Sequence, residues 1–403
     1  MTIRTITART ADQLARRDPS RDPSVIRQAR AIVTDVRDRG EVALRLWMRK
    51  LDGVRPPFET SRRDLHRAWN ATPRDVRRAI ETAVRHARRV AGQQMPASSV
   101  IKVRPGVTIE SRVTALSRVA CYVPGGRFPL PSTAIMTVVP ASVAGVKDIA
   151  VVCPAPSPVV LAAALAAGAT SVSRLGGAQA IAAAAYGTTS FRRVDKIVGP
   201  GNAWVTAAKM LVAPDCAIDF RAGPSEIVVW SNEGPAEWIA ADLAAQAEHD
   251  PAARAILVTS KPRLAQDVRD RLTAHGRPTN VSLWVGSRSD IVALINQLAP
   301  EHLVCDGLAD ARLTVAATTF VGPWSAQAAG DYCTGSNHVL PTGGGARVRG
   351  GLTSADFVRL STVQTLTERG LRSIAGPIVT LAEAEGLRAH ARSISIRLQG
   401  RRR

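Results

Sequence analysis

The first hundred residues carry apolar side chains at the spacing of amphipathic helices. The pattern extends from Pro23 to Leu51 and returns from about Leu65 to Ala91. Thr72-Pro73 is a helix start signal inside the second stretch. Residues 1–20 are polar, and they are predicted to form an extended or short helical arm.

Strand-like and helix-like segments alternate through the middle of the chain. Short runs of β-branched and other apolar residues are each followed by an Ala-rich or amphipathic segment, which predicts a parallel sheet with helices packed on it. The expected strands are Ser117–Val123, Asp148–Cys153, Ser171–Leu175, Val194–Val198, Glu226–Val229, Ala255–Thr259, Val281–Val285, His302–Cys305 and Thr318–Val321. The expected helices are Val159–Ala167, Ala178–Tyr186, Ala203–Val212, Ala236–His249, Pro262–Ala274 and Asp290–Leu298.

Turns rich in glycine and proline mark the ends of successive expected strands. They are Pro124-Gly125-Gly126, Gly176-Gly177, Gly199-Pro200-Gly201 and Ala222-Gly223-Pro224-Ser225. In open parallel sheets, ligands bind beyond the carboxyl ends of the strands, where glycines let backbone N–H groups approach a phosphate. None of these turns is the G-x-G-x-x-G fingerprint, so each also fits a tight turn that needs positive φ.

The C-terminal part is expected to leave the sheets through the glycine-rich loop Pro341–Leu352. Ala355–Arg369 and Ile378–Ala391 are predicted to be helices, and Ser393–Leu398 is predicted to be a strand.

Composition restricts the kind of protein. The 403 residues carry a net charge of +20, which suits either a polyanionic partner or solvated, Arg-rich faces. We expect no nucleic-acid binding, because the basic residues are not interleaved with aromatics and no nucleic-acid motif accompanies them.

No apolar run approaches the about 20 residues of a membrane span, and the N-terminus lacks a signal-peptide core, so a cytoplasmic protein is expected. The five scattered cysteines indicate neither a disulfide framework nor a thiolate zinc site.

Gln246 and His249 close an expected helix at a spacing of three, which places both side chains on one face. An amide oxygen and an imidazole on one face can bind a metal, although His249 also fits a histidine that satisfies the carbonyls of a helix end. Together with Asp331 and one further histidine, they would form a nitrogen and oxygen ligand set that suits zinc. The Asp331 stretch also fits a polar loop with Asn and Asp turn chemistry.

Glu301 and His302 place a carboxylate and an imidazole side by side at the start of an expected strand. A histidine is the natural base near neutral pH. Because neighbouring residues of a strand face opposite ways, the two can serve one site only if the turn before the strand is irregular.

Seven segments resemble the motifs of the histidinol dehydrogenase family in order and spacing. They are Tyr122-Val123-Pro124-Gly125-Gly126, Gly176-Gly177-Ala178-Gln179-Ala180, Val194-Asp195-Lys196-Ile197-Val198-Gly199-Pro200-Gly201-Asn202, Ala222-Gly223-Pro224-Ser225-Glu226, Gln246-Ala247-Glu248-His249, Pro300-Glu301-His302-Leu303 and Gly330–Thr342. The resemblance runs from about residue 25 to the C-terminal unit.

The resemblance implies an α/β fold with two incomplete Rossmann-like parallel-sheet domains in an intertwined homodimer. Its expected parts are an N-terminal arm (1–20), a first domain with the metal and acid/base residues (21–120 with 230–350), a second domain on the NAD side (121–229), and a C-terminal helical unit exchanged across the dimer (351–403).

The resemblance also implies a cytoplasmic enzyme of histidine biosynthesis that oxidises L-histidinol through L-histidinal to L-histidine with zinc and two NAD. The implied acid/base pair is Glu301 and His302, and the implied NAD contacts are Tyr122, Gln179 and Asn202. The implied zinc ligands are Gln246, His249, Asp331 and, from the partner subunit, His390. These ligands and His302 also face the substrate, and further substrate contacts are implied for Ser225, His338 and Glu385.

Two other functions fit parts of the sequence. A paralogous zinc- and NAD-dependent dehydrogenase of another small alcohol, such as a sulfonated diol, would recruit extra Arg or Lys to its pocket. Glu385 and His338 favour a cationic, imidazole-bearing substrate instead. A basic nucleic-acid-binding protein that has lost catalysis would not need the intact Glu301-His302 pair.

Overall fold

The computed structural model describes residues 1–14, 18–126, 128–274 and 278–399, apart from the side chains of Gln13 and His249. The chain forms two compact units, Met1–Gln94 with Leu116–Phe357 and Met95–Ala115 with Val358–Arg403. Within the described ranges, no helix combines the length and the apolar composition that crossing a bilayer requires.

One six-stranded sheet of the first unit has the strand order β2-β7-β6-β5-β8-β9, and we call it the β5 sheet. All its pairings are parallel except that of β2 with β7. Its strands are β2 (Glu59–Thr60), β5 (Arg118–Tyr122), β6 (Asp148–Val152), β7 (Ser171–Ser173), β8 (Lys196–Val198) and β9 (Ala217–Ile218).

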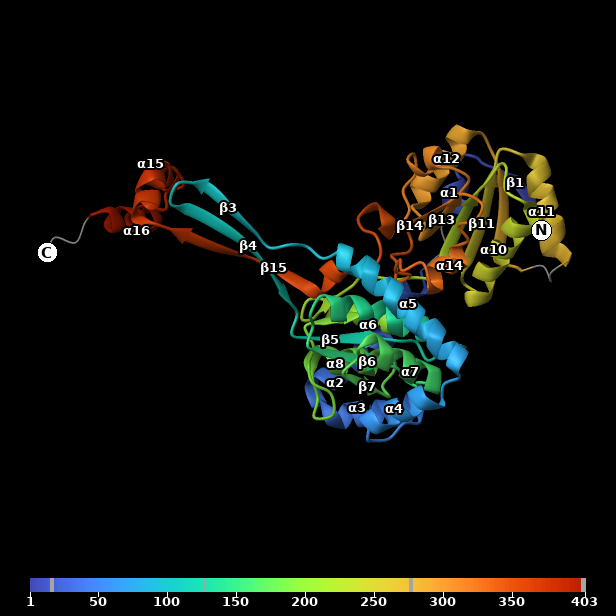
Figure 1. Ribbon diagram of the computed structural model, residues 1–403, viewed down its shortest axis with the longest axis horizontal. Helices are drawn as coiled ribbons and strands as arrows, with labels where there is room; N and C mark the ends of the chain where they lie inside the picture. Colours follow the sequence, from blue (N-terminus) through green and yellow to red (C-terminus); the bar gives the residue numbers. More distant parts are fainter. Residues whose placement is uncertain (15–17, 127, 275–277, 400–403) are drawn as a thin grey trace. The chain divides into compact units, whose positions relative to one another are not determined.

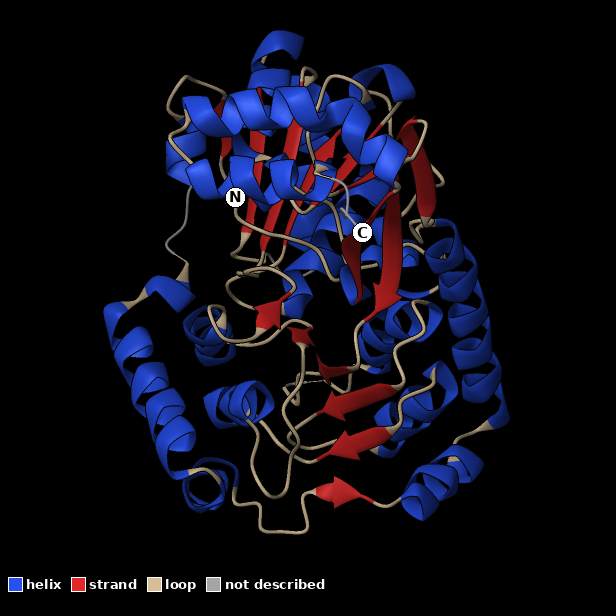
Figure 2. Cartoon of the chain, turned by 90° about the vertical axis from the view of Figure 1, so that its left-hand side faces the viewer, coloured by secondary structure: helices blue, strands red, loops and turns tan. Residues whose placement is uncertain are grey.

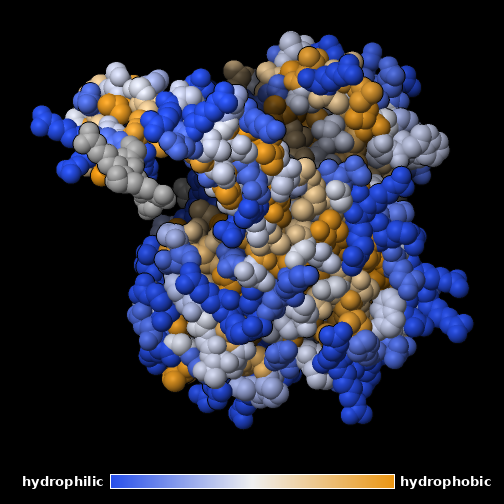
Figure 3. Space-filling model, turned by 60° about the vertical axis from the view of Figure 1, so that its left-hand side comes forward, coloured by the Kyte–Doolittle hydropathy of each residue, from blue (hydrophilic) through white to orange (hydrophobic). Residues whose placement is uncertain are grey.

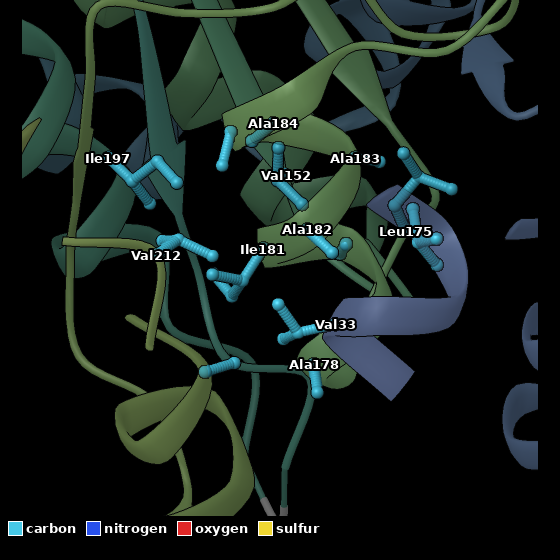
Figure 4. Close-up of a cluster of buried hydrophobic side chains, with 14 of the residues drawn as sticks. Val33, Val152, Leu175, Ala178, Ile181, Ala182, Ala183, Ala184, Ile197 and Val212 are labelled. Atoms are coloured by element: carbon cyan, nitrogen blue, oxygen red, sulfur yellow. The ribbon is translucent and has the colours of Figure 1, made fainter. Parts of the chain in front are cut away.

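Helices pack on both faces of the β5 sheet (Figure 2). They are α2 (Pro23–Arg39), α3 (Glu41–Trp47), α4 (Arg62–Ala71), α5 (Arg74–Gln93), α6 (Pro131–Val143), α7 (Pro158–Ala167), α8 (Gly177–Tyr186) and α9 (Ala203–Val212). The Asp22 side chain caps α2, Pro23 occupies its first turn, and Gly40 ends it. Figure 4 shows Val33 of α2 beside Ala178 and Ile181 of α8, within a core that also contains Val152 and Ile197 of the sheet.

The helices of residues 21–94 contact the β5 sheet layer, whereas the expected domain boundaries group residues 21–120 with residues 230–350. The apolar face of α2 packs against α8 and α9, and α4 and α5 pack against α7 and α6. Residues 21–94 therefore complete the β5 sheet layer, because their apolar stripe is buried there.

The second six-stranded sheet has the order β1-β12-β11-β10-β13-β14, and we call it the β10 sheet. All its pairings are parallel. Its strands are β1 (Ile3–Thr5), β10 (Glu226–Trp230), β11 (Arg254–Thr259), β12 (Val281–Val285), β13 (His302–Cys305) and β14 (Thr318–Val321). Its helices are α1 (Thr10–Leu14), α10 (Ala236–His249), α11 (Pro262–Ala274), α12 (Arg288–Leu298), α13 (Leu308–Ala311) and α14 (Gln327–Tyr332). Residues 1–20, expected as a separate arm, supply β1, which pairs with β12, and α1, which packs against α12.

The two sheets present opposite edges to one cavity. The turns Pro124-Gly125-Gly126 and Gly199-Pro200-Gly201 follow β5 and β8 at the carboxyl edge, as predicted. Ala222-Gly223-Pro224-Ser225 instead precedes β10, because the chain crosses there from one sheet to the other. A cavity of about 470 Å³ is lined by residues of all three turns.

The second unit is a three-stranded antiparallel sheet with two helices at one end (Figure 1). Its elements are β3 (Ser99–Arg104), β4 (Val107–Ala115), β15 (Val358–Leu366), α15 (Glu368–Ala384) and α16 (Arg388–Leu398). The prediction of a helix over Ala355–Arg369 is wrong, because most of that segment pairs with β4 as a strand. The prediction of a strand over Ser393–Leu398 is also wrong, since these residues continue α16.

Hydrophilic residues cover much of the face shown in Figure 3, with apolar residues scattered among them. Several arginines pair with carboxylates on the same helix, as Arg39 does with Asp35 and Arg45 with Glu41. These pairs fit solvated, Arg-rich helix faces.

Candidate functional site

Tyr122, Gln179 and Asn202, which the sequence predicts to contact NAD, line one cavity of about 790 Å³. Tyr122 ends β5, Gln179 lies in the first turn of α8, and Asn202 caps α9 by accepting a hydrogen bond from the Val205 N–H at 3.0 Å. The cavity therefore lies at the carboxyl edge of the β5 sheet, where helix N-termini favour an anion. The structure brings the three residues together, and their role toward NAD remains a prediction.

Close backbone approach shapes this edge. Gly199 has φ of +108°, and a Cβ there would meet the Tyr122 carbonyl oxygen at 2.2 Å. The turn after β8 can therefore lie against the end of β5 only with glycine at this position.

Ser225 joins two of the predicted site residues. Its Oγ donates a hydrogen bond to Glu301 Oε2 at 2.6 Å and accepts one from Gln246 Nε2 at 2.9 Å. Glu301 Oε2 also accepts a hydrogen bond from the Glu226 N–H at 2.9 Å. Three segments far apart in the sequence thus converge at the amino edge of the β10 sheet.

Glu301 and His302 do face one site. Glu301 lies in the bend before β13, and His302 Nδ1 is 3.7 Å from Glu301 Oε2. The preceding Ala299 ends α12 with φ of +44°, in the left-handed region. This irregular turn removes the alternation that would have separated the two side chains.

The surroundings of His302 keep its imidazole neutral. Burial lowers the pKa of His302 to about 4, against the opposing effect of the Asp331 carboxylate. Its Nδ1 lies 3.3 Å from the Glu226 carbonyl oxygen, which can only accept a hydrogen bond. The proton of the neutral ring is therefore assigned to Nδ1, which leaves the Nε2 lone pair available as a base.

Gln327 is a site residue that the sequence analysis missed. Its buried Nε2 donates a hydrogen bond to Asp331 Oδ2 at 2.8 Å and lies 3.5 Å from His302 Nε2. The missed signal was the spacing of four from Asp331, which places both side chains on one face of α14. His338 adjoins the same group, with Nδ1 3.0 Å from the Asp331 carbonyl oxygen.

The predicted metal ligands are only partly described. Gln246 is fully buried, and its Oε1 has no hydrogen-bond partner among the described residues. The His249 side chain lies outside the described residues, and Glu385 and His390 belong to the second unit. Within the described side chains, no three His, Cys, Asp or Glu residues gather closely enough to hold a metal.

Two cavities connect the β5 sheet edge to Ser225. The 790 Å³ cavity and the 470 Å³ cavity share Pro124, Gly126 and Asn202, and the second also includes Ser225. An extended ligand that fills both cavities would therefore reach from Gln179 to Ser225, whose Oγ contacts Glu301.

Comparisons with known proteins identify the family. The family model for histidinol dehydrogenase matches residues 15–398. Histidinol dehydrogenase of Haloarcula marismortui is 43% identical over 99% of this chain and 100% of its own, and that of Agrobacterium fabrum is 42% identical over 92% and 91%. The crystal structure of histidinol dehydrogenase from Elizabethkingia anophelis superposes with a TM-score of 0.91 at 30% identity, covering 98% of this chain and 97% of that one. The chain therefore belongs to the histidinol dehydrogenase family, whose members are NAD-dependent dehydrogenases.

Proposed function

We propose that this protein oxidises L-histidinol through L-histidinal to L-histidine, the last steps of histidine biosynthesis, with two NAD per substrate. The observation that carries the proposal is the contact of Ser225 with both Gln246 and Glu301, beside the neutral His302. That contact joins a candidate metal ligand to a candidate acid/base pair in a chain of this family.

His302 is suited to remove the proton of the substrate hydroxyl. Its Nε2 is unprotonated at neutral pH, and its Nδ1 proton is held by the Glu226 carbonyl oxygen. The ring orientation is thereby fixed before substrate binds, which lowers the reorganisation that proton transfer requires.

Glu301 is suited to activate the water that attacks the aldehyde in the second oxidation. The hydrogen bonds from Ser225 Oγ and the Glu226 N–H both reach Oε2 and orient the carboxylate. The hydrate formed in this way again presents a hydroxyl proton to His302.

The residues present fit a zinc ion. The buried, unpaired Oε1 of Gln246 is an amide oxygen that a metal would satisfy. Gln246, His249, Asp331 and His390 of the partner subunit would hold the ion, an oxygen and nitrogen donor set within the range of zinc chemistry. When bound, zinc would orient the imidazole and amine of the substrate.

Tyr122, Gln179 and Asn202 would bind NAD, the hydride acceptor, along the two connected cavities. Ser225, His338 and Glu385 of the partner subunit would contact the substrate, together with the metal ligands and His302. The carboxylates near this position suit the cationic histidinol better than a sulfonated diol.

The second unit supports a homodimer. Among the described residues of this unit, the buried apolar side chains are few and mostly small, whereas larger ones stay exposed. The buried ones are Val107, Ala375, Ala382 and Ala391, and the exposed ones include Val100, Ile101, Val103, Leu360 and Leu381. So little core suggests that the unit packs against a second copy in the cytoplasmic enzyme.

Two variants test the assignment. His302→Asn should lower kcat on L-histidinol by at least about 100-fold, the size of a general-base contribution, with the zinc content unchanged. Gln246→Ala should lower the zinc content as well as kcat. Equal zinc loss in both variants would show that His302 is a ligand, and activity on a sulfonated diol alone would replace the proposed substrate.

A further inference from the structure

One carboxylate in the 790 Å³ cavity has no place in the proposed chemistry. Asp52 ends the short π-helical segment η2 (Met48–Asp52) and is exposed on the cavity wall. Its Oδ2 accepts a hydrogen bond from Gln179 Nε2 at 2.7 Å. That contact also determines the orientation of the Gln179 amide, because the amide oxygen would be repelled if it faced the Asp52 carboxylate.

Asp52 has no cationic partner among the described residues, although the protein is strongly basic. In the described part of the chain, no Lys or Arg lies within ion-pair distance of its carboxylate. Lys50, two residues away, lies instead over the Trp47 ring, 5.0 Å from its centroid. Partial desolvation raises the pKa of Asp52, with a smaller opposing effect of Gln179. A partly desolvated carboxylate at a cavity wall, with no cation beside it, is free to accept hydrogen bonds from a ligand.

The position of Asp52 indicates which part of a dinucleotide it would meet. The cavity that reaches Ser225 shares Pro124, Gly126 and Asn202 with the Asp52 cavity but does not include Asp52. Asp52 therefore lies at the end remote from the reacting carbon, where the adenosine half would bind. Trp47 and Trp204 line the same end, and Trp204 Nε1 is held by Gln28 Oε1 at 3.1 Å.

We propose that Asp52 accepts hydrogen bonds from the adenosine ribose hydroxyls of NAD and excludes NADP. The inference rests on the proposed function. A ribose diol can donate to a carboxylate, as acidic residues do in dinucleotide-binding folds generally. A 2′-phosphate would remove one donor and place negative charge against a carboxylate that no cation neutralises.

The test compares the affinities for NAD and NADP in the absence of L-histidinol, by calorimetric titration of the full-length enzyme. Asp52→Asn keeps an acceptor for Gln179 but removes the charge, and Asp52→Ala removes both. The ratio of the Kd for NADP to the Kd for NAD should fall at least about tenfold in both variants, the size of a like-charge penalty. Asp38→Asn, on the exposed face of α2, is the matched control and should leave the ratio unchanged.

If the ratio of the Kd for NADP to the Kd for NAD stays within about twofold of the wild-type value in both variants, the role of Asp52 is overturned. The expected tenfold change corresponds to about 1.4 kcal/mol and is well above that twofold limit. Wild-type protein that binds NAD but does not oxidise L-histidinol would contradict the proposed substrate while leaving the Asp52 test valid. Wild-type protein that binds neither dinucleotide would overturn both proposals.

Discussion

Lys209 and Asp219 form a buried ion pair directly behind the turn that carries Asn202. Lys209 Nζ donates a hydrogen bond to the Gly199 carbonyl oxygen at 2.9 Å, and Asp219 Oδ2 accepts one from the Gly199 N–H at 2.7 Å. Both polar groups of Gly199 are thus held by the pair. The pair positions the cofactor turn without touching the cavity.

Lys209→Met should loosen that turn, because it leaves the Asp219 carboxylate buried without its cation. Breaking a buried pair in this way costs about 3 to 5 kcal/mol of unfolding free energy. KM for NAD should rise more than KM for L-histidinol, as steady-state kinetics would show. The double variant Lys209→Met/Asp219→Leu should recover much of the stability; failure to recover any would mean that the pair does not act as a unit.

Ser225→Ala should lower kcat/KM for L-histidinol about 10- to 100-fold. The change leaves Gln246 Nε2 without its acceptor and removes the Ser225 donor to Glu301 Oε2. Each buried group left unpaired costs about 1 to 3 kcal/mol. Kd for NAD, measured separately, should stay near the wild-type value, and a parallel loss of NAD binding would contradict a local effect.

The contribution of His302 to the free energy of unfolding should fall as the pH drops from about 6.5 to about 4. The pKa of His302 is lowered to about 4 in the folded protein, so in this window the unfolded chain binds more protons. The loss is on the order of 3 kcal/mol at the acid end. Burial raises the pKa of Asp242 to about 6, which gives the opposite slope. Denaturant unfolding of the wild-type and His302→Asn proteins at each pH isolates the contribution of the histidine. The difference between their free energies of unfolding should shrink toward pH 4. A difference that does not change with pH would argue against a neutral, buried His302.

Gln327→Glu should move the acid limb of the kcat/KM profile to higher pH. A carboxylate 3.5 Å from His302 Nε2 would raise the pKa of His302 by about 1 to 3 units. Gln297→Glu makes the same charge change on the exposed face of α12 and should leave the profile in place. An unshifted limb in Gln327→Glu would indicate that another group titrates.

The sequence was informative where local rules decide structure. The alternation from Asp148 to Val321 was predicted because apolar runs bounded by glycine and proline specify strands and helices locally. The strand β15 was missed, although Val358, Thr362, Val363 and Thr365 are β-branched, because its pairing with β4 joins residues about 250 positions apart. The packing of α2 on the β5 sheet was missed for the same reason, since periodicity shows an apolar face but not its partner.

The candidate site, like the fold, could be predicted from the sequence only in part. Glu301 and His302 carried a recognisable motif, but their common orientation depends on the left-handed Ala299, which nothing in the local sequence requires. Gln327 and Asp52 belong to none of the segments that carried the family resemblance. Their positions become meaningful only when α14 approaches His302 and η2 approaches Gln179.

The central claim is a double oxidation at one site, and the amount of NADH formed per mole of L-histidinol tests it most directly. With L-histidinol limiting and NAD in excess, the account predicts two moles of NADH per mole of substrate, and none after zinc is removed with a chelator. One mole of NADH with release of the aldehyde, or undiminished activity in the zinc-free protein, would contradict it.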